Sequence, residues 1–292
     1  MRIAVYGRKL HPSAASHVRR IFDEMSEHGM ESIVYAPFAR HLRNHLGVDV
    51  PDATFTRRHE VRGQIDAVIS MGGDGTMLDT ITWAGPENIP VMGVNFGRLG
   101  FLASISPDEI PQAIRALDQG SSVIDERIML QLESNKPIFD RSSFALNEVT
   151  IQRLDTSSMI TVHAYLNGQL LNSYWADGII VATPTGSTGY SLSCGGPVIY
   201  PTSDNFIITP IAPHNLNVRP MVLSNDVVLS FAVEGRGDQF LVSLDSRAEK
   251  IDQSYELAVR QAPYKARLLR LNDGDFLNAI REKLLWGHDQ RN

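Results

Sequence analysis

The chain has 292 residues, of which 43% are hydrophobic and 21% are charged, a balance typical of globular proteins and too apolar for a disordered chain. Its formal net charge of −6 provides no overall basic field, which argues against nucleic acid or an anionic membrane as a partner. The single cysteine, Cys194, excludes an internal disulfide and indicates a reducing compartment. No apolar run reaches the roughly 18 residues that a transmembrane helix needs.

The N-terminal part alternates strands with helices. Residues 2–6 form an apolar strand pattern that leaves no room for a signal peptide, which favours a cytoplasmic location. Further strands are predicted at residues 32–36, 65–71 and 89–94, and helices at residues 18–25, 38–46, 76–83 and 107–119. Alternation of this kind predicts a parallel sheet with ligands at the carboxyl ends of its strands. We therefore expect a Rossmann-like α/β domain over residues 1–121.

From about Ser122 the pattern changes to strands and hairpin turns. Strands are predicted at residues 144–152, 160–166, 178–182, 205–209, 227–233, 239–244 and 266–271. Asn167-Gly168, directly after one of these runs, is the strongest short hairpin signal available. We expect an all-β domain, similar to a β-sandwich, over residues 122–271.

A last helix is predicted over residues 275–286, with Asp273 as its cap and Gly287 as its end. Phe276, Ile280 and Leu284 form one apolar stripe along it. Such a stripe needs a surface to cover, so residues 272–292 are treated as a separate C-terminal segment.

A glycine-rich turn is predicted where the third strand passes into a helix. Three glycines in four positions, Gly72, Gly73 and Gly75, allow close approach of the backbone to a ligand, and the free amides at a helix start attract phosphate. A site that only binds phosphate gains nothing from a negative charge at its centre. The Asp74 carboxylate therefore indicates a catalytic or metal-binding role beside the phosphates. The alternative is an ordinary Asp-Gly turn, but the neighbouring glycine pair is more than such a turn requires.

Two common nucleotide motifs are absent: the P-loop, and the G-x-G-x-x-G fingerprint after the first strand. The run Gly72 to Thr76 instead resembles the GGDGT signature shared by NAD kinases, diacylglycerol-type lipid kinases and phosphofructokinases. A second glycine-bearing loop, residues 95–102, resembles the N-x-G-x-L-G-F-L stretch of NAD kinases.

Two polar motifs stand out in the β-rich part. Asn147-Glu148 places an amide and a carboxylate side by side among apolar residues, and its simplest alternative is the polar edge of a half-buried strand. Residues 183–193 follow an apolar strand and are rich in Gly, Ser and Thr, which are neutral donors for phosphate and ribose oxygens. A flexible linker is the alternative, but Pro184 and Tyr190 favour an ordered loop.

Together with the Pro213 to Pro220 run, these motifs resemble the NAD kinase family in order and approximate spacing. The resemblance implies that Asp74 accepts the proton of the NAD ribose 2′-hydroxyl, and that glycine-turn residues hold phosphate: Gly72, Gly73, Gly75 and Thr76. It implies that the dinucleotide site contains Asp74, Gly75, Asn147, Glu148, Trp175, Asp177, Thr185, Thr188, Gly189, Tyr190, Ser191, Leu192, Ser193, Ala212 and Arg247. Gly189 stands where Ala is usual, and Arg247 stands where some relatives carry a neutral amide.

The expected activity is therefore transfer of the γ-phosphoryl group of ATP to NAD, giving NADP. The resemblance implies a divalent cation, with Mg²⁺ as the first choice, and a homodimer or homotetramer assembled through the β domain. It also implies that the C-terminal helix, in residues 272–292, returns to the first domain and packs on it. Metal ligands stay unassigned, and His214 is assigned a structural role. Two alternatives remain at this point: a lipid kinase, although no basic amphipathic segment for a membrane is visible, and an inert dinucleotide-binding regulator.

Overall fold

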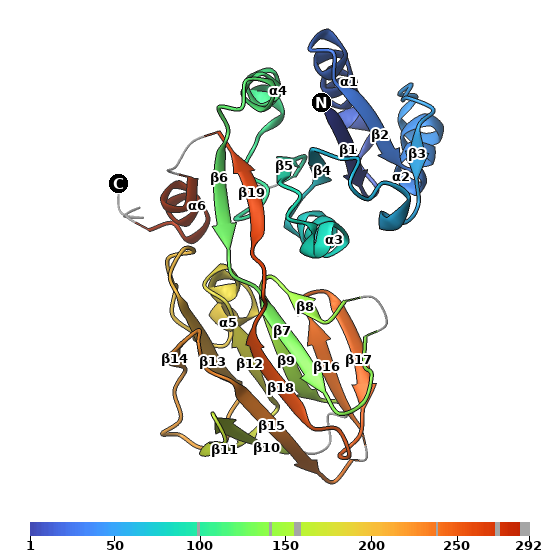
Figure 1. Cartoon of the computed structure of the whole chain (residues 1–292). Coiled ribbons are helices and arrows are strands. Elements are labelled where there is room, and N and C mark those ends of the chain that lie inside the picture. The colour runs from blue at the N-terminus through green and yellow to red at the C-terminus, as the bar shows by residue number, and fades with distance from the viewer. Residues whose placement is uncertain (98–99, 140–141, 155–158, 238, 272–274, 287–292) are drawn as a thin grey trace. The chain divides into compact units, whose positions relative to one another are not determined.

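The computed structural model describes residues 1–97, 100–139, 142–154, 159–237, 239–271 and 275–286 (Figure 1). Arg98 and Leu99 of the second glycine loop, and the predicted helix signals Asp273 and Gly287, lie outside the described residues. The chain forms two compact units: Met1–Glu126 with Arg267–Asn292, and Arg127–Ala266.

The first unit is built on a sheet with the strand order β3-β2-β1-β4-β5-β19-β6. Parallel pairing joins its neighbours from β3 through to β19. Figure 1 shows β6 and β19, which lie far apart in the sequence, side by side. The strands are β1 (Arg2–Gly7), β2 (Glu31–Tyr35), β3 (Thr54–Phe55), β4 (Ala67–Gly72), β5 (Val91–Asn95), β6 (Val123–Arg127) and β19 (Ala266–Arg270).

Helices of the first unit cover this sheet. They are α1 (Ala15–Glu27), α2 (Ala36–His41), α3 (Asp74–Ala84), α4 (Ile110–Asp118) and α6 (Asp275–Leu284). A π-helical turn, Leu42–Leu46, continues α2, and a 3-10 turn, Pro107–Glu109, precedes α4. Gly29, Gly47 and Gly120 each follow a helical segment and adopt a positive φ, near 60°, in which a glycine is not strained.

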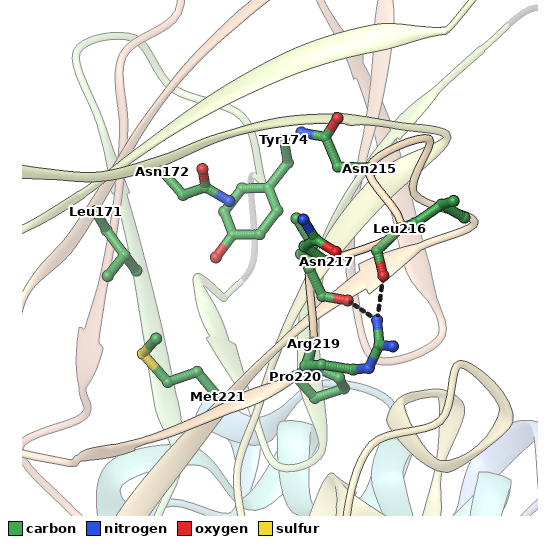
Figure 2. A pocket seen from close by; sticks show the side chains of 10 residues that line it. Leu171, Asn172, Tyr174, Asn215, Leu216, Asn217, Arg219, Pro220 and Met221 are labelled. Carbon is green, nitrogen blue, oxygen red and sulfur yellow. Dashed lines mark hydrogen bonds between the residues drawn. The ribbon is translucent and has the colours of Figure 1, made fainter.

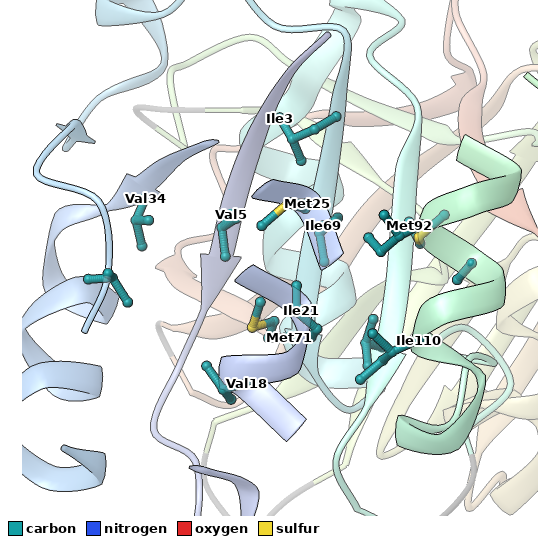
Figure 3. Close-up of a cluster of buried hydrophobic side chains, with 14 of the residues drawn as sticks. Ile3, Val5, Val18, Ile21, Met25, Val34, Ile69, Met71, Met92 and Ile110 are labelled. Atoms are coloured by element: carbon teal, nitrogen blue, oxygen red, sulfur yellow. The ribbon is translucent and has the colours of Figure 1, made fainter. Parts of the chain in front are cut away.

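The core of the first unit lies on the sheet face that α1 and α4 cover (Figure 3). Val18, Ile21 and Met25 recur at helical spacing on α1 and are buried against Ile69 and Met71 of β4. Alternate residues of β4 point to the opposite face, where the Ser70 hydroxyl bonds the Thr80 hydroxyl of α3 at 2.8 Å. The strand β4 is therefore buried on both faces, which fixes the position of the turn that follows it.

The second unit is a sandwich of two sheets with the orders β11-β10-β15-β18-β7-β8 and β14-β13-β12-β9-β16-β17. Neighbouring strands in these two orders pair antiparallel, and one apolar cluster fills the space between the two sheets. Its elements are β7 (Leu130–Ser134), β8 (Phe144–Ala145), β9 (Glu148–Arg153), β10 (Ile160–Leu166), β11 (Gln169–Ala176), β12 (Gly178–Ala182), α5 (Tyr190–Ser193), β13 (Asn205–Ile211), β14 (Met221–Ser224), β15 (Leu229–Gly235), β16 (Phe240–Leu244), β17 (Arg247–Ile251) and β18 (Leu257–Gln261).

The predicted fold class is confirmed: an N-terminal α/β unit, a C-terminal β-sandwich, and a final helix that packs on the first unit. Asn167-Gly168 forms the predicted hairpin between β10 and β11, with φ values of 49° and 83°. Two details differ from the expectation. The strand β19 pairs in parallel with β5 of the first sheet rather than in the second domain, and the predicted strand 144–152 is broken at Leu146-Asn147.

Candidate active site

The glycine turn joins the buried strand β4 to helix α3. Gly73 precedes the helix, and Asp74 is its first residue. A Cβ on Gly72 would lie 2.7 Å from the Cβ of Thr76, so a larger residue would collide with the first turn of the helix. Around Gly73 and Gly75, by contrast, a Cβ would meet no atom within 4 Å. The turn thus leaves open space beside the free amides of the helix start, as a phosphate site requires.

The carboxylate of Asp74 is held by backbone amides of the second glycine loop. The Phe101 N–H donates to Oδ2 at 2.8 Å, and the Leu102 and Ala103 N–H groups donate to Oδ1 at 3.1 Å each. A Cβ on Gly100 would overlap the same carboxylate, so glycine is required there. Three converging donors hold the Asp74 side chain beside this loop.

A second contact to Asp74 comes from the C-terminal helix α6. The Lys283 ammonium lies 3.9 Å from Asp74 Oδ2 and 4.4 Å from the centroid of the Phe101 ring. Phe276 of the same helix packs against Phe101 with a ring separation of 6.2 Å. Helix α6 therefore covers the loop that orients Asp74.

In the second unit, Asn147 and Glu148 lie at the break between β8 and β9, where Asp245 holds the backbone. The Asp245 carboxylate accepts the N–H groups of Leu146, Asn147 and Glu148 at 2.9, 2.8 and 3.1 Å. Burial raises the pKa of Asp245, although these three amides oppose that shift. Asp245 lies in the β16–β17 turn at φ 52°, so one turn residue fixes the geometry of the Asn147-Glu148 pair.

The Gly-Ser-Thr loop folds directly over this pair. The Thr183 N–H donates to the Asn147 carbonyl at 2.9 Å, and a Cβ on Gly186 would lie 2.8 Å from the Asn147 Cα. A Cβ on Gly189 would meet Glu148 Oε2 at 3.0 Å. Close backbone approach therefore requires glycine at Gly186, and the loop is ordered rather than a flexible linker.

Two oxygens at this place are buried without a partner among the described residues: Asn147 Oδ1 and Glu148 Oε2. Buried polar atoms are nearly always hydrogen-bonded, so we expect a ligand group or a water molecule to bond each of these two oxygens. Burial, reinforced by the negative charge of Asp245, raises the pKa of Glu148 from 4.5 to about 8. At neutral pH the Glu148 carboxyl is therefore largely protonated and can donate a hydrogen bond to a ligand oxygen.

Tyr190 of this loop lies close enough to Asp177 for the negative charge of the carboxylate to affect the phenol. Burial, followed by the effects of Cys194 and Asp177, raises the pKa of the Tyr190 phenol. The carboxylate of Asp177 pairs with Arg153 at 2.9 Å, and the Tyr190 ring is 38% exposed, which leaves it accessible for stacking.

The structure assigns structural contacts to several of the predicted binding residues. Thr185 is buried and accepts a hydrogen bond from Arg127 at 3.2 Å. Ser191 is buried against the Thr209 hydroxyl at 2.8 Å. Arg247 donates to the carbonyls of Ser142 and Phe144. These three side chains stabilise the surrounding loops.

The remaining predicted residues of the second unit lie around the same loop or on a neighbouring strand end. Thr188 donates to the Thr185 carbonyl at 3.3 Å, and Leu192 and Ser193 follow on α5. Trp175 is 55% exposed near the end of β11, and its carbonyl accepts the His214 N–H at 2.8 Å. Ala212 adopts φ 42° just after β13.

A separate cavity of about 690 Å³ lies between β11 and the segment 215–221 (Figure 2). Tyr174 and Asn172 face it from the strand, and Arg219 closes the segment by donating to the carbonyls of Leu216 and Val218 at 2.6 and 2.8 Å. None of the predicted dinucleotide residues lines this cavity. The chemistry is therefore better located from side-chain geometry than from cavity size.

Within the described residues, no group of three or more His, Cys, Asp or Glu side chains could hold a metal ion. No helix in the described part of the chain has the length and apolar character needed to cross a membrane.

The structure groups the predicted residues into two sets. Asp74 and the glycine turn belong to the first unit, whereas Asn147, Glu148, Asp177 and the Gly-Ser-Thr loop belong to the second. Two further residues contact the site, Asp245 and Lys283, and the sequence did not identify either of them. Asp245 directly follows the predicted strand 239–244, but sequence alone did not connect it to Asn147-Glu148.

Comparison with known proteins gives a consistent result. A family model described as the ATP-NAD kinase N-terminal domain matches residues 3–121, and one described as the ATP-NAD kinase C-terminal domain matches residues 146–271. NAD kinase from Cytophaga hutchinsonii is 42% identical over 294 residues, and NAD kinase from Bacteroides fragilis (strain ATCC 25285) is 40% identical over 292 residues. Both alignments cover 100% of this chain and 100% of the relative.

Two solved structures are similar throughout. A yeast NADH kinase complexed with NADH has a TM-score of 0.89 at 22% identity, covering 100% of this chain and 89% of that chain. An NAD kinase from Archaeoglobus fulgidus in complex with ATP has a TM-score of 0.75 at 26% identity, covering 95% and 96%. At 22% identity the first likeness shows the fold alone.

Proposed function

This chain belongs to the NAD kinase family, and from that membership we propose that it transfers the γ-phosphoryl group of ATP to the adenosine 2′-hydroxyl of NAD, forming NADP. The single observation that carries the proposal is the Asp74 carboxylate, which three backbone amides orient at the start of a helix with open space beside it.

We assign the proton transfer to Asp74. The 2′-hydroxyl proton moves to the Asp74 carboxylate, the hydroxyl oxygen bonds the γ-phosphorus, and the bond from that phosphorus to the bridging oxygen of ADP breaks. A general base of this kind is worth about 10²- to 10⁴-fold, and the remaining acceleration of a loose phosphoryl transfer comes from positioning and charge neutralisation. The N–H groups of Gly73 and Gly75 are assigned to phosphate oxygens. The Thr76 N–H donates to the Gly73 carbonyl at 3.0 Å, so Thr76 is proposed to contribute by shaping the turn.

Recognition of NAD is assigned to the second unit. This assignment is supported by the buried oxygens of Asn147 and Glu148, which have no hydrogen-bond partner among the described residues. The exposed Tyr190 and the Asp177 carboxylate support it as well. Thr188, Gly189, Leu192, Ser193, Trp175 and Ala212 complete the proposed set. Thr185, Ser191 and Arg247 are proposed to contribute through the shape of the loops that they stabilise, because their side chains bond other groups of the protein.

We further propose that the donor is the Mg²⁺ complex of ATP and that the cation enters with the donor phosphates. A cytoplasmic location is proposed from the single cysteine, which suits a reducing compartment. A homodimer or homotetramer is proposed as well. Its support is the edge strand β14, where Met221 and Val222 are 43% and 45% exposed, an apolar edge of the kind that pairing with a second copy would cover.

The proposal is tested by incubating the purified chain with ATP and Mg²⁺ in two arms. One arm contains NAD in lipid-free solution, and the other contains vesicles with diacylglycerol. We expect NADP in the first arm, detected with an NADP-specific dehydrogenase, and no phosphorylated lipid in the second. Lipid phosphorylation without NADP would favour the lipid-kinase alternative, whereas NAD binding without turnover would favour the inert regulator.

A further inference from the structure

Lys283, on the C-terminal helix α6, directs its charge at the proposed catalytic carboxylate. Its ammonium lies 3.9 Å from Asp74 Oδ2 and 4.4 Å from the centroid of the Phe101 ring. Phe101 is also the residue whose N–H donates to Asp74 Oδ2 at 2.8 Å. The lysine and the amide therefore converge on the same carboxylate oxygen, and the aromatic ring beneath the ammonium limits where the lysine can move.

Docking of the helix α6 does not depend on this charge. Ala279 and Ile280 are each 5% exposed, and Phe276 packs against Phe101 with an interplanar angle of 50°. The Lys283 and Asp74 side chains are 28% and 32% exposed, and ion pairs this accessible to solvent contribute little to folding. The position of the lysine is thus better explained by the carboxylate than by the anchoring of the helix.

The two oxygens of Asp74 are not equivalent. Within the described part of the chain, Oδ1 accepts two N–H groups, from Leu102 and Ala103, whereas Oδ2 accepts only the N–H of Phe101. Each carboxylate oxygen has about two acceptor sites, so Oδ1 is filled and Oδ2 keeps one site open. At 3.9 Å the Lys283 ammonium lies beyond hydrogen-bond distance and leaves that site unoccupied.

From this asymmetry we infer that Asp74 Oδ2 is the oxygen that receives the substrate hydroxyl and that Lys283 is a positioning residue for the transfer. The inference rests on the proposed function. Attraction between the ammonium and Oδ2 opposes rotation of the carboxylate away from the hydroxyl, while the amides hold its other oxygen. A loss of this restraint lowers the fraction of bound substrate that is aligned for proton transfer, which reduces kcat more than it weakens NAD binding.

The test measures kcat and KM for NAD in Lys283→Met, which keeps the length of the side chain without its charge, and in Lys283→Arg. Arg281→Met is the matched control, since Arg281 lies on the same helix and bonds Asn278 at 3.3 Å. We expect kcat to fall about tenfold in Lys283→Met with KM changed less than about twofold, substantial recovery in Lys283→Arg, and no change in the control.

A double-mutant cycle separates positioning from structure. In an Asp74→Asn background, Lys283→Met should cause little further loss of the residual activity, because the carboxylate that it orients is gone. An equal loss in both backgrounds, or an unchanged kcat in Lys283→Met, would overturn the inference alone. Absence of NADP with the unmodified chain would overturn the proposed function together with the inference. If Lys283→Met melts well below the control, Lys283→Gln replaces it in the same cycle.

Discussion

At the scale of single residues, the proposed chemistry depends on a carboxylate whose position is set by backbone amides. Sequence reasoning identified Asp74 because a carboxylate has no use in a turn that only binds phosphate, and therefore indicates chemistry beside the phosphates. It did not identify Lys283, because spacing along the chain does not reveal that a residue of the last helix lies over the glycine turn. Asp245 was not identified for the same reason, because the three amides that it accepts lie about 100 positions earlier in the chain.

Asp74→Asn should separate catalysis from binding. The amide keeps the size of the side chain but cannot accept the hydroxyl proton, so kcat should fall by about two to four orders of magnitude while the Kd for NAD changes far less. Steady-state kinetics and calorimetric titration with NAD measure the two quantities, and thermal melting checks the fold. Near-normal turnover by a folded Asp74→Asn variant would remove Asp74 from the role of base.

Glu148 should make stability depend on pH. Burial raises its pKa to about 8 in the folded protein, against 4.5 in the unfolded chain, so between these values the folded state binds more protons. Stability therefore falls as pH rises from about 4.5 to 8, and the penalty is absent below that window. Glu148→Gln should stabilise the ligand-free protein at pH 8 by on the order of 2 to 4 kcal/mol and have little effect near pH 4.5.

Urea unfolding at both pH values measures this difference. Glu249→Gln, at an exposed position on the nearby strand β17, is the matched control and should leave the pH dependence as it is in the unmodified chain. An equal effect of Glu148→Gln at both pH values would contradict the assigned protonation of Glu148.

At the scale of elements, local patterns predicted most strands and helices of the first unit. The strand β12 has the predicted bounds, because a short β-branched run ends at a proline-containing loop. The break between β8 and β9 was not predicted, since apolar residues on both sides of Asn147-Glu148 continue the strand pattern. What interrupts the strand is the distant Asp245, whose carboxylate takes the amides of that segment.

Gly100→Ala should damage the site through the loop rather than through the base itself. The added Cβ would overlap the Asp74 carboxylate and push it off its three amides, so kcat should fall about tenfold or more. Gly97→Ala is the control in the same loop, because its Cβ would meet only Asn95 Oδ1, at 3.8 Å. The kcat of Gly100→Ala should be lower than that of Gly97→Ala when both are measured at a temperature at which both variants are folded. An equal kcat would show that the contact at Gly100 is unimportant.

At the scale of the whole molecule, the sequence predicted an α/β part followed by a β-sandwich but misplaced the last strand. The strand β19 is largely buried and apolar, and such a run fits a parallel sheet as well as a sandwich. Its pairing with β5 depends on contacts between distant segments, which no local pattern contains. The family resemblance in turn predicted the activity, because its motifs extend over both units.

Self-association should be visible in solution. Sedimentation velocity at micromolar concentration is expected to give two or four times the mass of one chain. Met221→Lys and Val222→Lys together should shift the mass toward the monomer, because charge on an edge strand opposes pairing. Leu170→Lys, at a 56% exposed position on β11, is the control for an added charge on the same unit. A monomer in the unmodified chain would contradict the proposed assembly.

The most direct test of the proposed function follows the transferred group itself. ATP labelled in its γ-phosphoryl group is incubated with the chain, Mg²⁺ and NAD, and the labelled product is isolated and its phosphate position assigned by ³¹P and ¹H NMR. We predict that the label enters NADP at the adenosine 2′-oxygen and that the Asp74→Asn variant yields almost none in the same time. Label in another position, or in inorganic phosphate alone, would contradict the assignment of this chain as an NAD kinase.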